Sequence, residues 1–301
     1  MIGTANPRKG DRLWRSVVIA LPYFWLSLFF LAPFAIVFKI SFADPLVAQP
    51  PFTPFFDWAQ EGQHRLLATL DNYRFLTEDK LYWVSYLKSI KIALISTGLC
   101  LLLGFPMAYA IARTPYPWRN LLLLLVILPF WTSFLLRVYA WMIMLGKEGL
   151  INSMLEGVGL IDSPLHLLYT DGAVYVGIVY SYLPFMVLPL YATLEKLDLD
   201  LHDAAADLGA KPLQVFRDIT LPVAMPGIIA GSLLVFIPAL GEYVIPALLG
   251  GLDSLMIGRT LYDEFFINRD WPLASAVATV LLLILILPIM LFQRMQQESE
   301  P

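Results

Sequence analysis

Glu242 and Arg137 are the residues best suited to bind a charged ligand, because each lies within a long apolar run of the sequence. A charged side chain in hydrocarbon costs several kcal/mol unless it is paired or reached by water, so such residues usually mark a path or a binding site. A carboxylate at Glu242 would attract a cation. Arg137 falls at a similar height in another predicted helix, so the two residues could instead form a fixed, structural ion pair. The sequence leaves both interpretations open.

Aromatic side chains near these charges could add to the binding of an organic cation. A cation over an aromatic face gains about 0.5–2 kcal/mol, but aromatic rings also serve as anchors at the membrane interface. For any single ring, interfacial anchoring is the stronger interpretation. The aromatic candidates for a substrate path are Trp131, Tyr139, Tyr182 and Tyr243.

The segment that carries Glu242 has the composition of a helix that breaks. Glu242 lies 15 residues beyond Gly227 (242 minus 227), which is roughly 22 Å along a helix and places it in the outer half of the membrane. Pro238 and Pro246 flank it, and with Gly241 they can unwind the helix and free carbonyl groups to line a polar cavity. The sequence therefore predicts a break beside the carboxylate.

A membrane fold is needed to position these residues. Hydrophobic residues make up 58% of the 301 residues, charged residues make up 15%, and the mean hydropathy is +0.69, which indicates a polytopic membrane protein. A span across roughly 30 Å of hydrocarbon needs about 20 apolar residues, and six segments meet that length. We predict an all-α integral membrane protein with a single domain over residues 1–301, an outer loop at 43–87, and helices near residues 17–41, 89–111, 121–145, 173–194, 227–249 and 273–292.

The distribution of charge argues against a nucleic-acid partner and predicts how the chain is oriented in the membrane. The net charge of −4 is spread along the chain without a polybasic tract, so the sequence does not indicate a nucleic-acid partner. The lone Cys100 has no disulfide partner, and His64, His166 and His202 are too scattered to suggest a metal site. Lys and Arg are in moderate excess on the side that holds both termini, which predicts cytoplasmic termini and a cytoplasmic loop at residues 195–225.

This cytoplasmic loop at 195–225 is predicted to form two short helices. Apolar residues recur there at helical spacing and so share one face: Leu197, Leu201, Ala204, Ala205 and Leu208. Gly209 follows where a helix commonly ends in a left-handed residue, and Pro212 suits the start of a second helix that ends at Leu221-Pro222. Another face carries the acidic residues Asp200, Asp203 and Asp207. The helical pattern alone also fits an amphipathic connector at the membrane surface.

A known docking motif is similar to this stretch. Permease subunits of binding-protein-dependent ABC importers engage their ATPase through a loop written E-A-A-x3-G-x9-I-x-L-P. The matching residues here are Asp203-Ala204-Ala205-Ala206-Asp207-Leu208-Gly209 and, after nine residues, Ile219-Thr220-Leu221-Pro222. Asp203 stands where the family usually has Glu, which keeps the charge with one methylene less. The resemblance implies that the residues in contact with the ATPase are Asp203, Ala204, Ala205, Asp207, Gly209, Phe216 and Pro222.

Other segments resemble one branch of that family, the polyamine importer permeases of the putrescine type. They are Asp71-Asn72-Tyr73 with Phe75-Leu76, Leu128-Pro129-Phe130-Trp131-Thr132-Ser133, Arg137-Val138-Tyr139-Ala140-Trp141, Leu240-Gly241-Glu242-Tyr243-Val244 and Arg269-Asp270-Trp271-Pro272. The resemblance covers nearly the whole chain. It implies a six-helix, type I ABC importer permease fold in the bacterial inner membrane. The expected substrate is putrescine, although the sequence does not distinguish it from spermidine.

The resemblance also implies partners. These are two copies of a cytoplasmic ATP-binding subunit, a second permease subunit that forms a heterodimer with this chain, and a periplasmic polyamine-binding protein, assembled in the lipid membrane. The chain has no G-x4-G-K-[ST] phosphate loop, so we expect it to be no enzyme and to bind no cofactor, with ATP and Mg used by the partner ATPase. The alternative is an ion-coupled secondary carrier for a cationic metabolite. Such carriers often show two related halves, and we find no convincing internal repeat.

Overall fold

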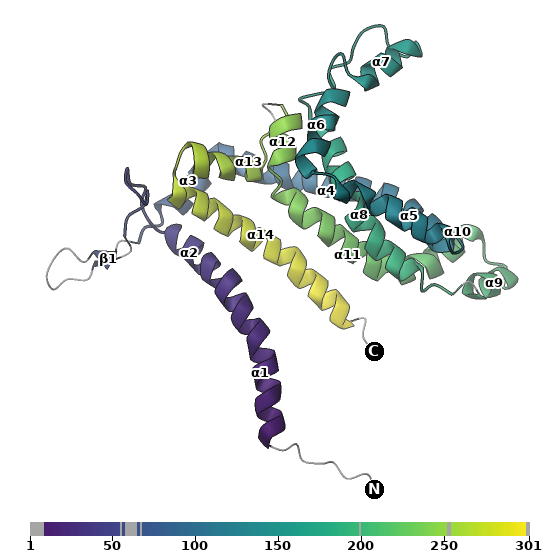
Figure 1. Cartoon of the computed structure of the whole chain (residues 1–301), viewed down its shortest axis with the longest axis horizontal. Helices are drawn as coiled ribbons and strands as arrows, with labels where there is room; N and C mark the ends of the chain where they lie inside the picture. The colour runs from purple at the N-terminus through teal and green to yellow at the C-terminus, as the bar shows by residue number, and fades with distance from the viewer. Residues whose placement is uncertain are drawn as a thin grey trace. The chain divides into compact units, whose positions relative to one another are not determined.

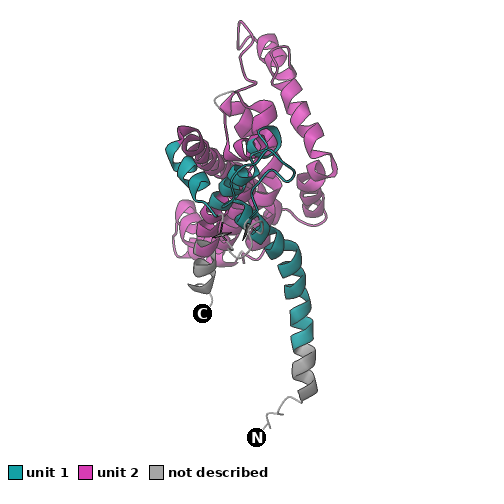
Figure 2. Cartoon of the chain, turned by 90° about the vertical axis from the view of Figure 1, so that its left-hand side faces the viewer, with its two compact units in different colours: residues 1–78, 264–280 teal, residues 79–263, 281–301 magenta. Residues whose placement is uncertain are grey.

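Nearly every regular element of the chain is a helix. The structure is a computed structural model that describes residues 9–54, 56–57, 65–66, 68–198, 200–251 and 254–298. The chain forms two compact units, which Figure 2 draws in different colours: residues 1–78 with 264–280, and residues 79–263 with 281–301.

The elements follow one another along the chain in the order given below, and Figure 1 labels the α-helices and β1. The first are α1 (Lys9–Leu26), the π-helical η1 (Ser27–Leu31), α2 (Ala32–Ile40), the antiparallel strands β1 (Phe56–Asp57) and β2 (Arg65–Leu66), and α3 (Asp71–Glu78). Next come α4 (Lys80–Arg113), α5 (Trp118–Ile127), the 3-10 helix η2 (Leu128–Trp131), α6 (Phe134–Met144), α7 (Leu150–Gly157) and α8 (Asp171–Leu194). The last are α9 (Asp200–Asp207), α10 (Pro212–Val215), η3 (Phe216–Thr220), α11 (Leu221–Leu240), α12 (Val244–Leu249), α13 (Ile257–Tyr262), η4 (Asp263–Ile267) and α14 (Trp271–Glu298).

Several of these helices are long and apolar enough to cross a membrane. Within the described residues there are five such stretches, or up to six if one bent pair of helices counts as a single span. The five are Ser16–Ile40, Lys80–Arg113, Asp171–Leu194, Pro212–Leu240 and Trp271–Met290. The prediction of an all-α membrane fold is therefore confirmed, while the predicted boundaries differ in three places.

The continuous helix predicted at 121–145 is wrong, because the chain bends there by 91° between Trp131 and Phe134. Pro129 cannot donate a backbone hydrogen bond, and the turn that contains it tightens to the 3-10 helix η2. Thr132 then adopts an extended backbone and donates its hydroxyl to the Pro129 carbonyl at 2.8 Å. A threonine that satisfies a local carbonyl in this way competes with continuation of the helix.

The helix predicted at 227–249 is also divided. α11 ends at Leu240, and α12 starts again at Val244. The break falls beside Glu242, at the place that the neighbouring glycine and prolines predict. At its other end the same helix is longer than predicted, since the apolar stretch begins at Pro212.

The second span starts at Lys80 rather than at residue 89. The side chain of Asp79 accepts a hydrogen bond from the Leu81 amide at 2.8 Å, which satisfies one of the free N–H groups at the start of a helix. The outer segment 43–87, predicted as a loop, accordingly contains α3 and the beginning of α4.

Close packing of α8 against α4 and α11 forms the centre of the larger unit. Met186 of α8 is fully buried between two glycines. A Cβ atom at Gly104 would lie 3.0 Å from its Cγ, and one at Gly231 would lie 2.8 Å from its Sδ. At Gly227 a Cβ would lie 2.7 Å from the Pro189 carbonyl oxygen. Gly227 and Gly231, spaced as in a G-x3-G motif, thus let α11 approach α8 within this chain.

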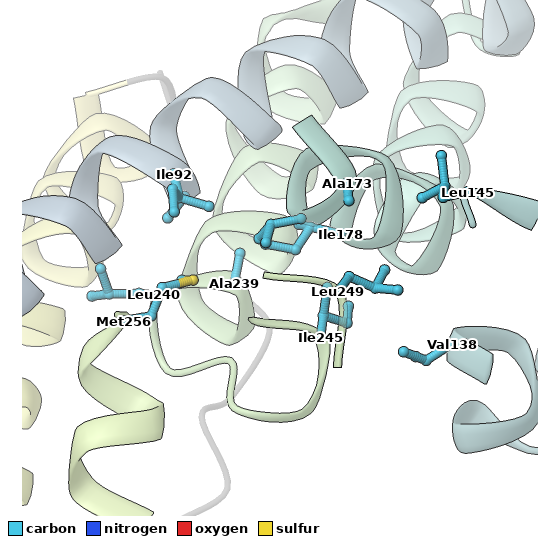
Figure 3. Close-up of a cluster of buried hydrophobic side chains, with 12 residues drawn as sticks. Ile92, Val138, Leu145, Ala173, Ile178, Ala239, Leu240, Ile245, Leu249 and Met256 are labelled. Atoms are coloured by element: carbon cyan, nitrogen blue, oxygen red, sulfur yellow. The ribbon is translucent and has the colours of Figure 1, made fainter. Parts of the chain in front are cut away.

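A cluster of buried side chains holds the short helix α12 in place (Figure 3). Ile245 and Leu249 of α12 are fully buried and belong to the same cluster as Ile178 of α8 and Val138 of α6. Such van der Waals packing, rather than exclusion from water, holds helices together in a membrane. The segment that follows the break is therefore fixed by its neighbours.

A buried asparagine ties the smaller unit together. The Nδ2 atom of Asn72 in α3 donates to the carbonyls of Ser41 at 3.0 Å and Ala43 at 2.8 Å. Phe265 and Trp271 stack in the same unit with ring centroids 5.0 Å apart. The asparagine satisfies two buried carbonyls in the turn that follows α2.

We expect Gly227→Ala to loosen the packing of α11 on α8. The added methyl group would collide with the α8 backbone, and overpacking of this kind costs about 1–3 kcal/mol. The midpoint of thermal unfolding of the purified protein in detergent is expected to fall by several degrees. Gly98→Ala is the matched control, because nothing lies within 4 Å of a Cβ atom at that helical glycine. An unchanged midpoint for Gly227→Ala would contradict this packing.

Candidate functional site

The loop at 195–225 contains the helix and the turn that its sequence predicts. α9 is followed by Gly209, whose φ of 81° is the left-handed conformation expected at that position. The amide of Ala210 donates to the carbonyl of Ala205 at 3.0 Å, which satisfies a group left free at the end of the helix. The positive φ is what favours glycine here. Close packing is not the reason, because a Cβ at Gly209 would meet no other atom within 4 Å.

The second helix of the loop does not end at Leu221-Pro222 as predicted. α10 passes into the π-helical turn η3 and then directly into α11. In η3 the Leu221 amide donates to the carbonyl of Phe216, five residues earlier. This wider turn gives room to the exposed Pro222, whose ring would clash with a carbonyl in a regular α-helix. From Pro212 onward, the second helix of the loop and the membrane helix α11 are therefore one continuous helical path.

The apolar face of α9 is exposed to solvent in this chain. Leu201 is 50% exposed and Leu208 is 89% exposed. Ala204 is also exposed, and Ala205 is half-buried. We call these four residues the docking face. Exposed apolar side chains grouped on a polar segment are typical of a surface that binds a partner.

Not every residue predicted for this face belongs to it. Leu197 precedes α9 and is buried within the chain. Phe216 is 39% exposed, and its ring packs edge-on against Phe105 of α4 at 5.6 Å, so it also anchors the loop, and its contact with the ATPase stays a prediction. Asp203 and Asp207 are exposed, and neither forms an ion pair with any residue that the structure describes. Both carboxylates thus border the docking face.

His202 fastens the loop to the membrane helices, a role that the sequence pattern does not indicate. Its Nδ1 lies 3.4 Å from Nη2 of Arg113 at the end of α4, and its Nε2 lies 3.1 Å from the Thr220 hydroxyl. Arg113 in turn lies over the Tyr109 ring at 5.0 Å. The two partners of His202 are 89 and 18 residues away along the chain, so only the fold brings them together.

Glu242 is buried at the break after α11, with 7% of its surface exposed, and both of its oxygens accept hydrogen bonds. Oε1 accepts from the amides of Val244 at 3.0 Å and Ile245 at 3.4 Å. Oε2 accepts from the hydroxyl of Tyr182 in α8. The carboxylate therefore caps α12 and joins it to α8.

Arg137 is buried as well, but it does not pair with Glu242. Its guanidinium carbon lies 5.4 Å from the centre of the Phe130 ring and 5.6 Å from that of Phe134. The ion pairs of the described residues do not include one between Arg137 and Glu242. The sequence left open whether Glu242 pairs with Arg137 or attracts a cation. The direct ion pair is not formed.

The aromatic residues predicted for the path have different positions. Tyr182 contacts the buried carboxylate directly. Tyr243 follows that carboxylate in the chain, but its ring stacks on Tyr262 with centroids 4.0 Å apart. Trp131 is 73% exposed and Tyr139 is 46% exposed, and neither forms a hydrogen bond to the carboxylate in the described part of the chain. The structure thus brings Tyr182 to the carboxylate and leaves the other three rings elsewhere.

Three phenylalanines that were not among the predicted path residues complete the surroundings of the two charges. Phe130 packs edge-on against Phe185 at 5.1 Å, and Phe185 lies 6.1 Å from the ring of Tyr182. Phe134 lies one helical turn before Arg137, a spacing visible in the sequence, whereas the positions of Phe130 and Phe185 depend on the bend. An aromatic lining beside one carboxylate suits an organic cation. We define the aromatic–charge cluster as Phe130, Phe134, Arg137, Tyr182, Phe185 and Glu242.

Known proteins resemble this chain over most of its length. A family model described as binding-protein-dependent transport system inner membrane component matches residues 101–299. The spermidine/putrescine transport system permease protein PotB of Escherichia coli (strain K12) is 45% identical over 230 residues, which cover 76% of this chain and 83% of that protein. The protein of the same name from Salmonella typhimurium (strain SL1344) is 40% identical over 286 residues, which cover 95% of each chain.

Solved structures share the fold. A chain of the bacterial alginate ABC transporter, in complex with an alginate pentasaccharide-bound periplasmic protein, aligns with a TM-score of 0.68 and 19% identity over 96% of each chain. A chain of the inward-facing MetNI methionine ABC transporter aligns with a TM-score of 0.53 and 17% identity, covering 72% of this chain and 95% of that one. At such low identity the likeness concerns the fold alone.

We expect removal of the His202 imidazole to loosen α9. A hydrogen bond contributes roughly 1 kcal/mol, so His202→Ala is expected to speed hydrogen–deuterium exchange of the α9 amides by about fivefold. Exchange in α4 is expected to stay unchanged. His166→Ala is the control, because His166 is exposed in the segment before α8. If exchange in α9 is the same in His202→Ala and in the unaltered protein, the anchor is not formed.

Proposed function

Because the chain belongs to the family of binding-protein-dependent transport system inner membrane components, we propose that it is the permease subunit of an ATP-driven ABC importer that carries polyamines into the cytoplasm. We propose putrescine as the main substrate. Relatives at 45% and 40% identity are named spermidine/putrescine transport system permease proteins, which supports this class of substrate.

The observation that carries the proposal is a continuous helix that the turn at Gly209 joins to the docking face and that ends beside a buried carboxylate. The apolar stretch runs for 29 residues from Pro212 to Leu240, which is roughly 43 Å along a helix. α9 lies just before Pro212, and Glu242 lies just after Leu240. A partner that pulls on the docking face therefore displaces the end of the helix beside the carboxylate.

The proposed assembly supplies the energy from outside this chain. Two copies of a cytoplasmic ATP-binding subunit use ATP and Mg, and this chain binds neither. A second permease subunit forms a heterodimer with it, and a periplasmic polyamine-binding protein delivers the substrate. Both termini lie in the cytoplasm in this arrangement, which puts the docking face on the side of the ATPase. ATP binding closes the two ATPase copies, and the docked loops convert that closure into rocking of the membrane helices.

The buried carboxylate is the proposed recognition group for the substrate. A polyamine carries ammonium groups, which a carboxylate and aromatic faces attract. In this role Glu242 exchanges the hydroxyl of Tyr182 for an ammonium group while the amides of Val244 and Ile245 continue to donate to it. The break in the helix stays capped, so the exchange leaves the fold intact.

We expect a large charged side chain on the docking face to block assembly. Ala204 is exposed, so Ala204→Arg is expected to leave the thermal midpoint unchanged and to lower the yield of complex with the ATP-binding subunit by at least about tenfold. Co-purification on a tagged ATP-binding subunit measures this yield. Ala48→Arg is the matched control, since it puts the same side chain on an exposed alanine of the outer segment. Normal assembly of Ala204→Arg would refute docking through α9.

Loss of the negative charge at Glu242 is expected to weaken transport more than it weakens the fold. Glu242→Gln keeps an oxygen that can accept from Val244 and Ile245, so assembly is expected to stay close to normal. Uptake of labelled putrescine by the reconstituted complex with ATP is expected to fall by roughly tenfold or more, because the attraction to an ammonium group is lost. Glu242→Ala removes the cap as well and is expected to impair both. Equal losses of assembly and uptake in Glu242→Gln would indicate a purely structural carboxylate.

Spermidine is measured beside putrescine in the same uptake experiment, with and without ATP. Faster uptake of putrescine at equal concentration supports the proposed preference, and faster uptake of spermidine contradicts it. Uptake that does not depend on ATP would favour an ion-coupled carrier instead.

A further inference from the structure

Arg137 carries a buried positive charge whose hydrogen bonds are incomplete. The side chain is 8% exposed, and its Nε and Nη1 atoms have no acceptor in the described part of the chain. A buried charged donor without an acceptor costs several kcal/mol, so such a group calls for a specific role.

This guanidinium contacts two aromatic faces instead of hydrogen-bond acceptors. They belong to Phe130 and Phe134, at 5.4 Å and 5.6 Å from the guanidinium carbon. Tyr182 lies close enough for the charges of both Arg137 and Glu242 to act on its phenol. The guanidinium thus occupies the aromatic part of the aromatic–charge cluster, one side chain away from the carboxylate.

An ammonium group drawn to this cluster would compete with Arg137. The aromatic faces and the carboxylate attract any organic cation, whether it belongs to the protein or to a ligand. Two cations about 4 Å apart repel each other by roughly 4 kcal/mol at an effective dielectric constant of about 20. The guanidinium and a ligand ammonium group therefore exclude each other from the cluster.

We propose that Arg137 is a resident cation, which fills the aromatic–charge cluster while substrate is absent and is displaced from Phe130 when an ammonium group of the substrate arrives. This inference rests on the proposed function, because the competing ligand is a polyamine. Competition from Arg137 keeps the affinity of the membrane site low. The substrate is consequently released from the path instead of being retained beside the carboxylate.

The position of Phe130 gives this displacement a mechanical consequence. Phe130 lies before the 91° bend of the third span, whereas Phe134 and Arg137 lie after it. The contact between the guanidinium and Phe130 therefore spans the bend. When the guanidinium leaves Phe130, the two halves of the broken span lose a contact that fixes their angle.

Equilibrium binding of labelled putrescine tests this role. The binding is measured on the purified complex of this chain with its permease and ATP-binding partners, without the binding protein. Arg137→Met removes the charge and keeps a flexible apolar side chain, so putrescine is expected to bind about tenfold more tightly. Arg137→Lys retains a cation and is the matched control, with an affinity close to that of the unaltered complex. The maximal rate of uptake is expected to fall in Arg137→Met, because substrate leaves the site more slowly.

Two results would overturn the inference. Unchanged or weaker binding by Arg137→Met would show that the guanidinium does not compete with the substrate. Failure of both Arg137→Met and Arg137→Gln to assemble would show that the guanidinium is needed for the fold. ATP-dependent uptake by the unaltered complex is measured in parallel. Its absence would remove the proposed function itself, whereas uptake together with unaltered binding in Arg137→Met would remove only the role of Arg137.

Discussion

The amides of Val244 and Ile245 begin a new helix within an apolar stretch of the chain, where a backbone N–H group needs an acceptor inside the protein. Glu242 supplies the acceptor with one oxygen and receives the Tyr182 hydroxyl on the other. One carboxylate thus lets α11 end and α12 begin, and it ties the break to α8. The break and the negative charge are found together because this side chain replaces helical hydrogen bonds.

One continuous helix connects the turn that follows the docking face to the break at Glu242. The π-helical turn η3 accommodates Pro222, so the helical path is not interrupted between the docking loop and the membrane. Met186, seated between Gly104 and Gly231, couples this path to α4 and α8. In the proposed mechanism, a force applied at α9 passes through the turn at Gly209 and then along the closely packed helices to the break.

The two buried charges keep their electrostatic influence because they do not neutralise each other directly. Glu242 is surrounded by neutral donors, and Arg137 lies on aromatic faces. A direct ion pair would leave little net field for a charged ligand. In the proposed role, the cluster with its charges apart holds a cation from the protein or from a ligand, but not both.

Local features were readable from the sequence because they depend on neighbouring residues. The apolar runs, the left-handed turn at Gly209 and the break beside Glu242 follow from side-chain hydropathy and from the backbone preferences of glycine and proline over a few turns. The contacts of Glu242 with Tyr182 and of His202 with Arg113 join residues 60 and 89 positions apart, and no local pattern encodes them. The same holds for the rings around Arg137, which depend on a bend that apolar composition does not reveal. The sequence by itself determined which groups are charged and where the helix breaks, whereas only the packing of distant helices decided which groups meet.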